Sequence, residues 1–207
     1  VDGGTFSAGR LVNPSLLDFR RGMLGLTDSN LVIGPAGMFG DVLEVPSGQA
    51  IEVAQTATVE AGGHLAVTGG RFDANELVNH GLVELTRSPA RLGGTTLTNH
   101  GVLRGTGQID ARLDNCPGGE VRVGNGERLA ITEAGNANAG QLEVFAGELE
   151  AAQCLDNTGV LTGSDAVLRL TGGLANTGSL LLTAGTNHLY GDANNAADGS
   201  ILVTEIG

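Results

Sequence analysis

Apolar residues alternate with small or polar residues in short runs that recur along most of the chain. Each run follows a glycine, and the residues two and four positions later are aliphatic, as in Leu142 and Val144 after Gly140. The residues between them, such as Gln141 and Glu143, are polar or charged. Alternation with period two indicates a strand with one buried face and not a helix. The pattern therefore predicts many short, half-buried strands.

The predicted strands recur at a nearly constant interval. Successive gaps of 18, 20, 18, 21, 19, 19 and 21 residues separate the preceding glycines, which are Gly63, Gly81, Gly101, Gly119, Gly140, Gly159, Gly178 and Gly199. A period near twenty is typical of a solenoid, in which each repeat stacks on its neighbours. We therefore expect an all-β chain that forms one β-solenoid domain over residues 1–207, with about ten coils of roughly 18–22 residues.

Each coil is expected to contain three short strands. The second strand centres on Leu92, Ile109, Leu129, Leu149, Leu168 and Leu189. The third ends in a leucine two residues before an asparagine, namely Leu77, Leu97, Leu113, Leu155 and Leu174. Three short faces and an uneven period favour a right-handed parallel β-helix over a left-handed hexapeptide helix, which keeps a stricter period.

Residues 1–62 are less regular than the coils of residues 63–207. The segments 3–6 and 11–13 return as 69–72 and 77–79, displaced by 66 residues, which predicts three coils of 22 between them. Apolar strands are expected near Leu17 and Phe19, Leu31 and Ile33, and Ile51 and Val53. We assign Leu24, Met38 and Phe39 to a distorted coil.

The recurrent Asn-x-Gly segments predict an internal ladder of side chains at one corner. Stacked asparagines form hydrogen bonds along the axis and also satisfy the bent backbone. The ladder is expected to contain Asn79, Asn99, Asn115, Asn157 and Asn176, whereas Asn136 and Asn195 fit less well because no leucine lies two residues before them. The corner glycines Gly81, Gly101, Gly119, Gly140, Gly159 and Gly178 are expected to supply a positive φ.

Charge and composition exclude several partners. The chain has 35 glycines, a formal net charge of −12 and eleven basic residues, all of them arginine. An acidic chain without basic clusters is unsuited to nucleic acid or to an anionic membrane. No apolar run approaches the ~20 residues that span a bilayer. Because neither an initiator methionine nor a signal peptide is present, we expect an excised piece or a processed product.

Three side chains could form a metal site. His80, His100 and Cys116 each follow a ladder asparagine, so they are expected to stack on the outside of one corner in successive coils. Imidazole and thiolate are good zinc or copper ligands. The alternative is that corner residues of any solenoid stack in this way without a ligand.

Cys116 and Cys154 lie two coils or ~9.6 Å apart, beyond the ~7 Å limit for a disulfide, so two free thiols are predicted.

Clustered carboxylates suggest a second candidate site. Glu148 and Glu150 flank Leu149 and should both point outward, close to Glu127, Arg128 and Arg169. Paired carboxylates hydrolyse glycosidic bonds, but mixed charges on a strand face also form ordinary solvated pairs. A similar mixed column contains Glu84, Arg104, Arg122, Glu143 and Thr162. The sequence contains no nucleophile elbow, P-loop, dinucleotide fingerprint or calcium-binding nonapeptide repeat.

The segments Leu97-Thr98-Asn99-His100-Gly101 and Leu174-Ala175-Asn176-Thr177-Gly178 resemble repeats of large secreted bacterial surface proteins. Autotransporter passengers and filamentous-haemagglutinin-like adhesins contain similar runs. The resemblance implies export to the bacterial cell surface, a β-helical stalk or filament, and a role in adhesion or surface architecture. It brings no catalytic residues and no cofactor.

We therefore expect a non-catalytic structural or adhesive module, a rigid rod that displays other parts of a larger extracellular protein. The alternative is a polysaccharide-active or carbohydrate-binding β-helix with a site at Glu148 and Glu150. The expected partners are the rest of the surface protein and a glycan or host surface. A second copy could also stack on an uncapped end, because an exposed end coil is an open sheet edge.

Overall fold

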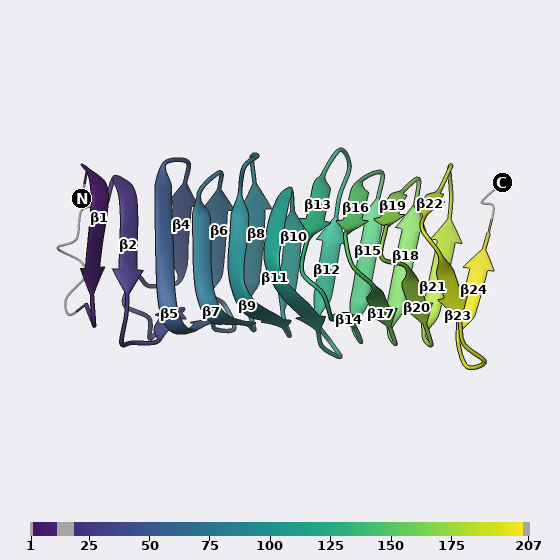
Figure 1. Ribbon diagram of the computed structural model, residues 1–207, viewed down its shortest axis with the longest axis horizontal. Helices are drawn as coiled ribbons and strands as arrows, with labels where there is room; N and C mark the ends of the chain where they lie inside the picture. Colours follow the sequence, from purple (N-terminus) through teal and green to yellow (C-terminus); the bar gives the residue numbers. More distant parts are fainter. Residues whose placement is uncertain (1, 12–18, 205–207) are drawn as a thin grey trace.

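The computed structural model describes residues 2–11 and 19–204 and shows a single-domain parallel β-solenoid of about ten turns (Figure 1). The described residues form strands and connections without a helix. The strands stack side by side along a rod, with the two ends of the chain at opposite ends of it (Figure 1). The predicted all-β solenoid is confirmed.

The strands form two sheets. The larger sheet contains 15 strands. Ten of them follow one another along the rod: β1 (Asp2–Ala8), β2 (Arg21–Leu26), β5 (Gln49–Val59), β7 (Arg71–Asn79), β9 (Arg91–Asn99), β11 (Gly107–Asn115), β13 (Arg128–Ile131), β16 (Glu148–Ala151), β19 (Val167–Leu170) and β22 (His188–Tyr190). Five short strands lie beside this path: β3 (Leu31–Ile33), β14 (Asn136–Asn138), β17 (Leu155–Asn157), β20 (Leu174–Asn176) and β23 (Ala193–Asn195).

The smaller sheet contains nine strands, and all of them except β4 follow one of the eight repeated glycines. They are β4 (Val42–Pro46), β6 (His64–Thr68), β8 (Leu82–Thr86), β10 (Val102–Gly105), β12 (Glu120–Val123), β15 (Gln141–Phe145), β18 (Val160–Ser164), β21 (Ser179–Thr183) and β24 (Ser200–Val203). Equivalent aliphatics pair in register, as Leu142 does with Leu161, and both are buried. The outward Glu143 remains exposed, as the period-two pattern predicts.

The number of strands per coil changes along the rod. From β13 onward each coil contains three strands, as predicted. In the preceding coils β5, β7, β9 and β11 are single long strands that cover both the second and the third face. A register shift between Val53 and Thr56 lies within the β5–β7 ladder, and a similar shift between Asp110 and Arg112 lies within the β9–β11 ladder. Such bulges bend a strand without ending it, so the corner that was expected to interrupt these strands is absorbed by the bend.

The register of the second face differs from the prediction at one step. Leu129, Leu149, Leu168 and Leu189 pair in successive coils. Ile109, however, pairs with Ile131, and Leu129 lies opposite Gly107. The reason is the length of the connections, because Thr106 alone separates β10 from β11, whereas residues 124–127 separate β12 from β13.

The N-terminal coils keep the predicted 66-residue offset but not the equal division. Phe6, Leu24, Ile51 and Phe72 pair in turn, at spacings of 18, 27 and 21 residues. The expected strands at Leu31–Ile33 and around Ile51 are present as β3 and β5. Phe19 lies outside the strands, and Leu17 lies outside the described residues.

The long second coil contains the segment that was assigned to a distorted coil. Leu24 is buried in β2, whereas Met38 and Phe39 lie in the turns between β3 and β4 and pack against the core while partly exposed. The extra residues of this coil therefore leave the regular stack and cover its side.

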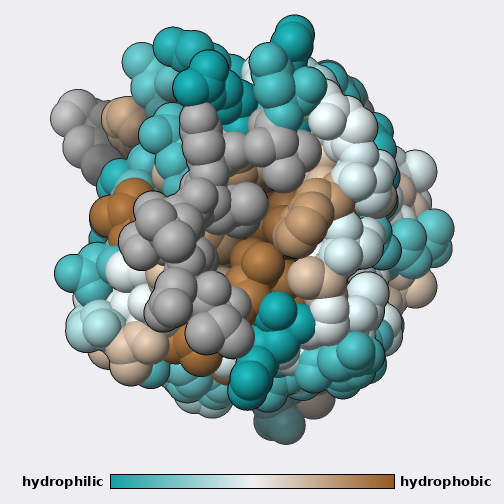
Figure 2. Space-filling view, turned by 90° about the vertical axis from the view of Figure 1, so that its left-hand side faces the viewer, coloured by the Kyte–Doolittle hydropathy of each residue, from teal (hydrophilic) through white to brown (hydrophobic). Residues whose placement is uncertain are grey.

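The core is a continuous column of apolar side chains along the axis of the rod, and nearly all of them are aliphatic. Figure 2 looks onto the N-terminal end and shows apolar residues in the middle, within a rim of hydrophilic ones. At the other end, Ile201 and Val203 occupy inward positions of β24, yet 45% and 70% of their surface is exposed because β24 is the last strand among the described residues. No helix in residues 2–11 and 19–204 is long and apolar enough to cross a membrane.

Candidate functional site

Seven asparagines form a hydrogen-bonded ladder inside the rod. The side-chain Nδ2 of each donates to the Oδ1 of the next, in the order Asn79, Asn99, Asn115, Asn138, Asn157, Asn176 and Asn195, at N···O distances of 2.6–2.7 Å. The first six asparagines are each no more than 1% exposed. Every asparagine that was expected in the ladder lies in it.

Two members of the ladder were not expected there. Asn138 was missed because Asn136 occupies the position two residues earlier where the other coils have leucine. Asn136 is itself buried outside the ladder, where it accepts a hydrogen bond from the backbone N–H of Leu113 and donates to the carbonyl of Glu133. The spacing Asn138-Ala139-Gly140 was the signal that could have found it. Asn195 precedes its glycine by four residues, as Asn115 does, and ends the ladder.

Each ladder amide also satisfies the backbone at the corner. The Nδ2 of Asn138 donates to the carbonyl of Val160 at 3.1 Å, and the other members from Asn79 to Asn176 bond the corresponding carbonyl of the next coil at 3.0–3.1 Å. Buried polar groups are costly unless they are paired. The ladder is therefore a paired internal network that ties each corner to its neighbour.

The corner glycines are required for a different reason from the one predicted. None of the six expected glycines has a positive φ. Instead, a Cβ atom on any of them would lie 2.2–2.3 Å from a carbonyl oxygen of the preceding coil, as at Gly159 beneath the oxygen of Gly140. The prediction of a left-handed conformation was wrong, because the close approach of stacked backbones excludes a side chain at these positions.

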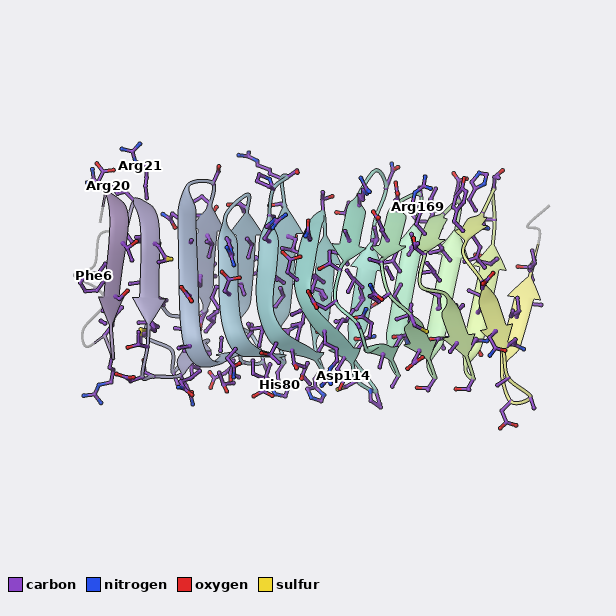
Figure 3. All side chains as sticks on the ribbon, in the orientation of Figure 1. Phe6, Arg20, Arg21, His80, Asp114 and Arg169 are labelled. Carbon is purple, nitrogen blue, oxygen red and sulfur yellow. The ribbon has the colours of Figure 1, made fainter. Side chains whose placement is uncertain are left out.

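His80, His100 and Cys116 lie in one column on the outside of this corner. The backbone N–H of His100 donates to the carbonyl of Asn79, and that of Cys116 donates to the carbonyl of Asn99. The two imidazole rings stack with their centroids 5.0 Å apart and their planes 6° from parallel. Figure 3 shows His80 and Asp114 along the same edge of the rod.

The column does not bring three metal ligands together. Within the part of the chain that the structure describes, no group of three or more His, Cys, Asp or Glu side chains could hold a metal ion. The Sγ of Cys116 lies 3.9 Å from the carbonyl oxygen of Asp114, which it contacts as a weak donor. A metal site at His80, His100 and Cys116 stays a prediction for titration to test.

Both thiols are free in the structure. Burial raises the pKa of Cys116 above its ordinary value, and the carboxylate of Asp114 adds to this effect. Partial burial raises the pKa of Cys154 as well, together with the charge of Asp156, whose Oδ1 accepts a hydrogen bond from the thiol at 3.6 Å. A raised pKa lowers the thiolate fraction at neutral pH and therefore the reactivity of both residues.

The outward carboxylates of the second candidate site are held in ion pairs. Arg128 contacts Glu150 and also lies 3.7 Å from Glu148, and the Nε of Arg169 donates to Glu148 at 2.6 Å. The carboxylate of Glu127 instead accepts a hydrogen bond from the backbone N–H of Gly124. The guanidinium carbon of Arg169 lies 4.6 Å from the ring centre of Tyr190, so Arg169 also makes a cation–π contact.

The smaller sheet has the same character on its outer face. Glu84, Arg104, Arg122, Glu143 and Thr162 form one column in register. Arg104 pairs with Glu84 at 2.8 Å, and Arg122 lies 4.0 Å from Glu143. Exposed pairs of this kind contribute little to stability. On both sheets, these outward carboxylates therefore lie beside arginines.

Comparison of the chain with protein families, with curated proteins and with solved structures finds no match.

Proposed function

We propose that this chain is a non-catalytic rod segment of an extracellular bacterial surface protein, which spaces or displays other parts of that protein and provides a surface for adhesion. The Asn ladder is the observation that supports this proposal most directly. It joins seven successive coils through side-chain hydrogen bonds that run along the axis, and all but the last of these bonds are buried. A network in this direction resists separation of the coils and contains no group that would react with a substrate.

The charged side chains support a structural role as well. Glu148 is paired with two arginines, and Glu150 is paired with Arg128. A carboxylate that acts as a general acid or nucleophile needs access to its substrate. The location at the cell surface rests on the Leu-x-Asn-Thr-Gly and Leu-x-Asn-His-Gly segments and their resemblance to surface-protein repeats.

Single-molecule pulling between the two ends of the chain tests the rod function. Because each coil contacts only its neighbours, we expect coils to detach one after another. Each coil of about twenty residues should release roughly 70 Å of extended chain. Loss of the whole fold in one step at low force would contradict the proposed rod function. Surface labelling of intact cells that produce the protein tests the location.

Incubation with polysaccharides tests the absence of catalysis. We expect no new reducing ends from neutral or uronic acid polymers, and equal results for the Glu148→Gln and Glu150→Gln variants. Turnover that either substitution abolishes would replace the rod proposal with the alternative, a polysaccharide-active enzyme with its site on the second face.

A further inference from the structure

A notch interrupts the outer face of the larger sheet where the chain makes its shortest connection. Thr106 alone joins β10 to β11, whereas residues 87–90 make the equivalent connection one coil earlier and residues 124–127 one coil later. Residues 88–90 of the earlier connection line the notch together with Thr106 and Gly107. The resulting cavity has a volume of about 600 Å³, which is within the ~300–1,000 Å³ range of small-ligand sites.

Small residues and polar residues both line the notch. Ala90, Gly107 and Ala130 are among the small ones, and Pro89 comes from the longer connection of residues 87–90. Arg91 and Arg128, from strands on either side of β11, also line the cavity. The notch therefore combines apolar patches with donors on both sides.

The charges of the notch are balanced within it. Arg91 lies 3.3 Å from the carboxylate of Asp110 and donates to the side-chain oxygen of Gln108 at 3.2 Å. Asp110 also accepts from the hydroxyl of Thr132 at 2.8 Å, and Arg128 is paired with Glu150. A cavity in which each cation faces a carboxylate offers directed donors and acceptors but little net attraction for an anion.

We propose that this notch, over β9, β11, β13 and β16, binds a neutral oligosaccharide. Sugar hydroxyls both donate and accept, which matches the guanidinium, amide, hydroxyl and carboxylate groups that line the cavity and its margin. The small apolar residues and Pro89 suit the C–H faces of sugar rings. Ion pairing already holds the two arginines in place, so binding costs little side-chain freedom. A peptide strand has no free sheet edge to join here, because β9, β11, β13 and β16 are paired on both sides.

This proposal names the partner of the adhesive surface and therefore rests on the rod function proposed above. It is tested by calorimetry on the whole chain with neutral hexasaccharides of glucose, mannose and N-acetylglucosamine, and with a hexamer of galacturonic acid for comparison. We expect saturable binding of at least one neutral hexasaccharide and none of the acidic one. Failure of all neutral sugars to bind, or binding of the acidic hexamer alone, overturns the proposal.

Two pairs of variants locate the binding. Arg91→Ala removes a donor from the notch, and Arg104→Ala removes a similarly exposed, ion-paired arginine from the other sheet. Ala130→Leu adds bulk to the lining of the notch, and Ala137→Leu adds the same bulk to an outward position of β14. We expect Arg91→Ala and Ala130→Leu each to weaken binding about tenfold, as the loss of one good contact does. The two controls should bind as the parent does.

Equal affinity in all four variants would place the sugar elsewhere and overturn the assignment. Circular dichroism of each variant shows whether the solenoid has formed before its affinity is compared. The rod function is judged separately by pulling. If no sugar binds while coils still detach one by one under force, the notch proposal fails and the rod proposal stands.

Discussion

The Nδ2 of Asn138 donates to the Oδ1 of Asn157 at 2.7 Å, and neither side chain is more than 1% exposed. Asn138 also accepts from Asn115, so it joins the two halves of the ladder. Replacing it with alanine removes both bonds and leaves the Oδ1 of Asn157 without its donor.

We expect Asn138→Ala to lower the free energy of unfolding by about 2–4 kcal/mol, because an orphaned buried polar group costs ~1–3 kcal/mol. Denaturant titration measures this loss through the midpoint. Asn125→Ala changes an exposed loop asparagine in the same way and should stay within ~0.5 kcal/mol of the parent. Similar losses at both positions would show that the ladder contributes nothing specific.

Leu142 and Glu143 are neighbours on β15 with opposite environments. Leu142 is 1% exposed, whereas about half of the Glu143 side chain is exposed. Leu142→Asp puts an unpaired charge between coils and should cost more than about 4 kcal/mol. Glu143→Ala removes a distant surface pair and should cost less than ~0.5 kcal/mol. Thermal unfolding followed by circular dichroism distinguishes the two, and equal behaviour would mean that the register of β15 is wrong.

Gly159 and Gly118 require glycine for two different physical reasons. A Cβ on Gly159 would lie 2.2 Å from the oxygen of Gly140, whereas Gly118 has a φ of +84° and open space around its Cβ position. Gly159→Ala forces stacked backbones apart and should cost about 3 kcal/mol. Gly118→Ala strains only its own conformation and should cost ~1–2 kcal/mol. Denaturant midpoints that rank the variants in the opposite order would contradict this explanation.

Asp73 gives the stability a dependence on pH. Burial raises its pKa above the ordinary value, although the guanidinium of Arg71 acts in the opposite direction. The folded state then binds more protons than the unfolded state between the two pKa values, so the contribution of Asp73 to stability falls as pH rises through this window. Asp73→Asn should therefore be more stable than the parent at pH 7 and lose this advantage in acid. Unfolding midpoints at a series of pH values measure it, with the exposed Asp198→Asn as the control that should show no such gain.

The two thiols should react slowly with alkylating agents. Burial and neighbouring carboxylates raise both pKa values. The alkylation rates of Cys116 and Cys154 should therefore increase with pH over a higher pH range than the alkylation rate of an unhindered cysteine peptide. Asp156→Asn removes one of the groups that raise the pKa of Cys154 and should accelerate that residue alone. Mass spectrometry of iodoacetamide-treated protein reads both sites at once, and acceleration of Cys116 by the same substitution would show an indirect effect.

The sequence predicts the repeated part of the rod well because the same pattern of apolar and polar positions recurs in every coil. A buried face alternates with an exposed one in each strand of the smaller sheet, so Leu142, Leu161 and Leu180 could be aligned by eye. The ladder follows from the same regularity. The prediction omitted Asn138 because it required a leucine two residues earlier, although Asn138 pairs in register with Asn115 and Asn157.

Features that arise from differences between coils were not predictable in the same way. The shift at Ile109 and the notch both result from the single residue between β10 and β11, and a one-residue connection leaves no periodic signal. The bulges in the β5–β7 and β9–β11 ladders depend on how the stacked backbones bend together. The reason for the corner glycines also lies in contacts between coils, so a single repeat could not reveal it.

The amides of the ladder all point the same way. Each Nδ2 is directed toward the C-terminal end, and the carbonyls of Glu120, Gln141 and Val160 hold this orientation because only an N–H can bond them. Aligned amide dipoles reinforce one another in a low-dielectric interior, much as peptide units do along a helix. The ladder therefore has a dipole directed along the axis, with its positive end at Asn195 and its negative end at Asn79. A coil inserted with the amide reversed would set two donors or two acceptors face to face, so the ladder enforces one polarity on every repeat that joins it.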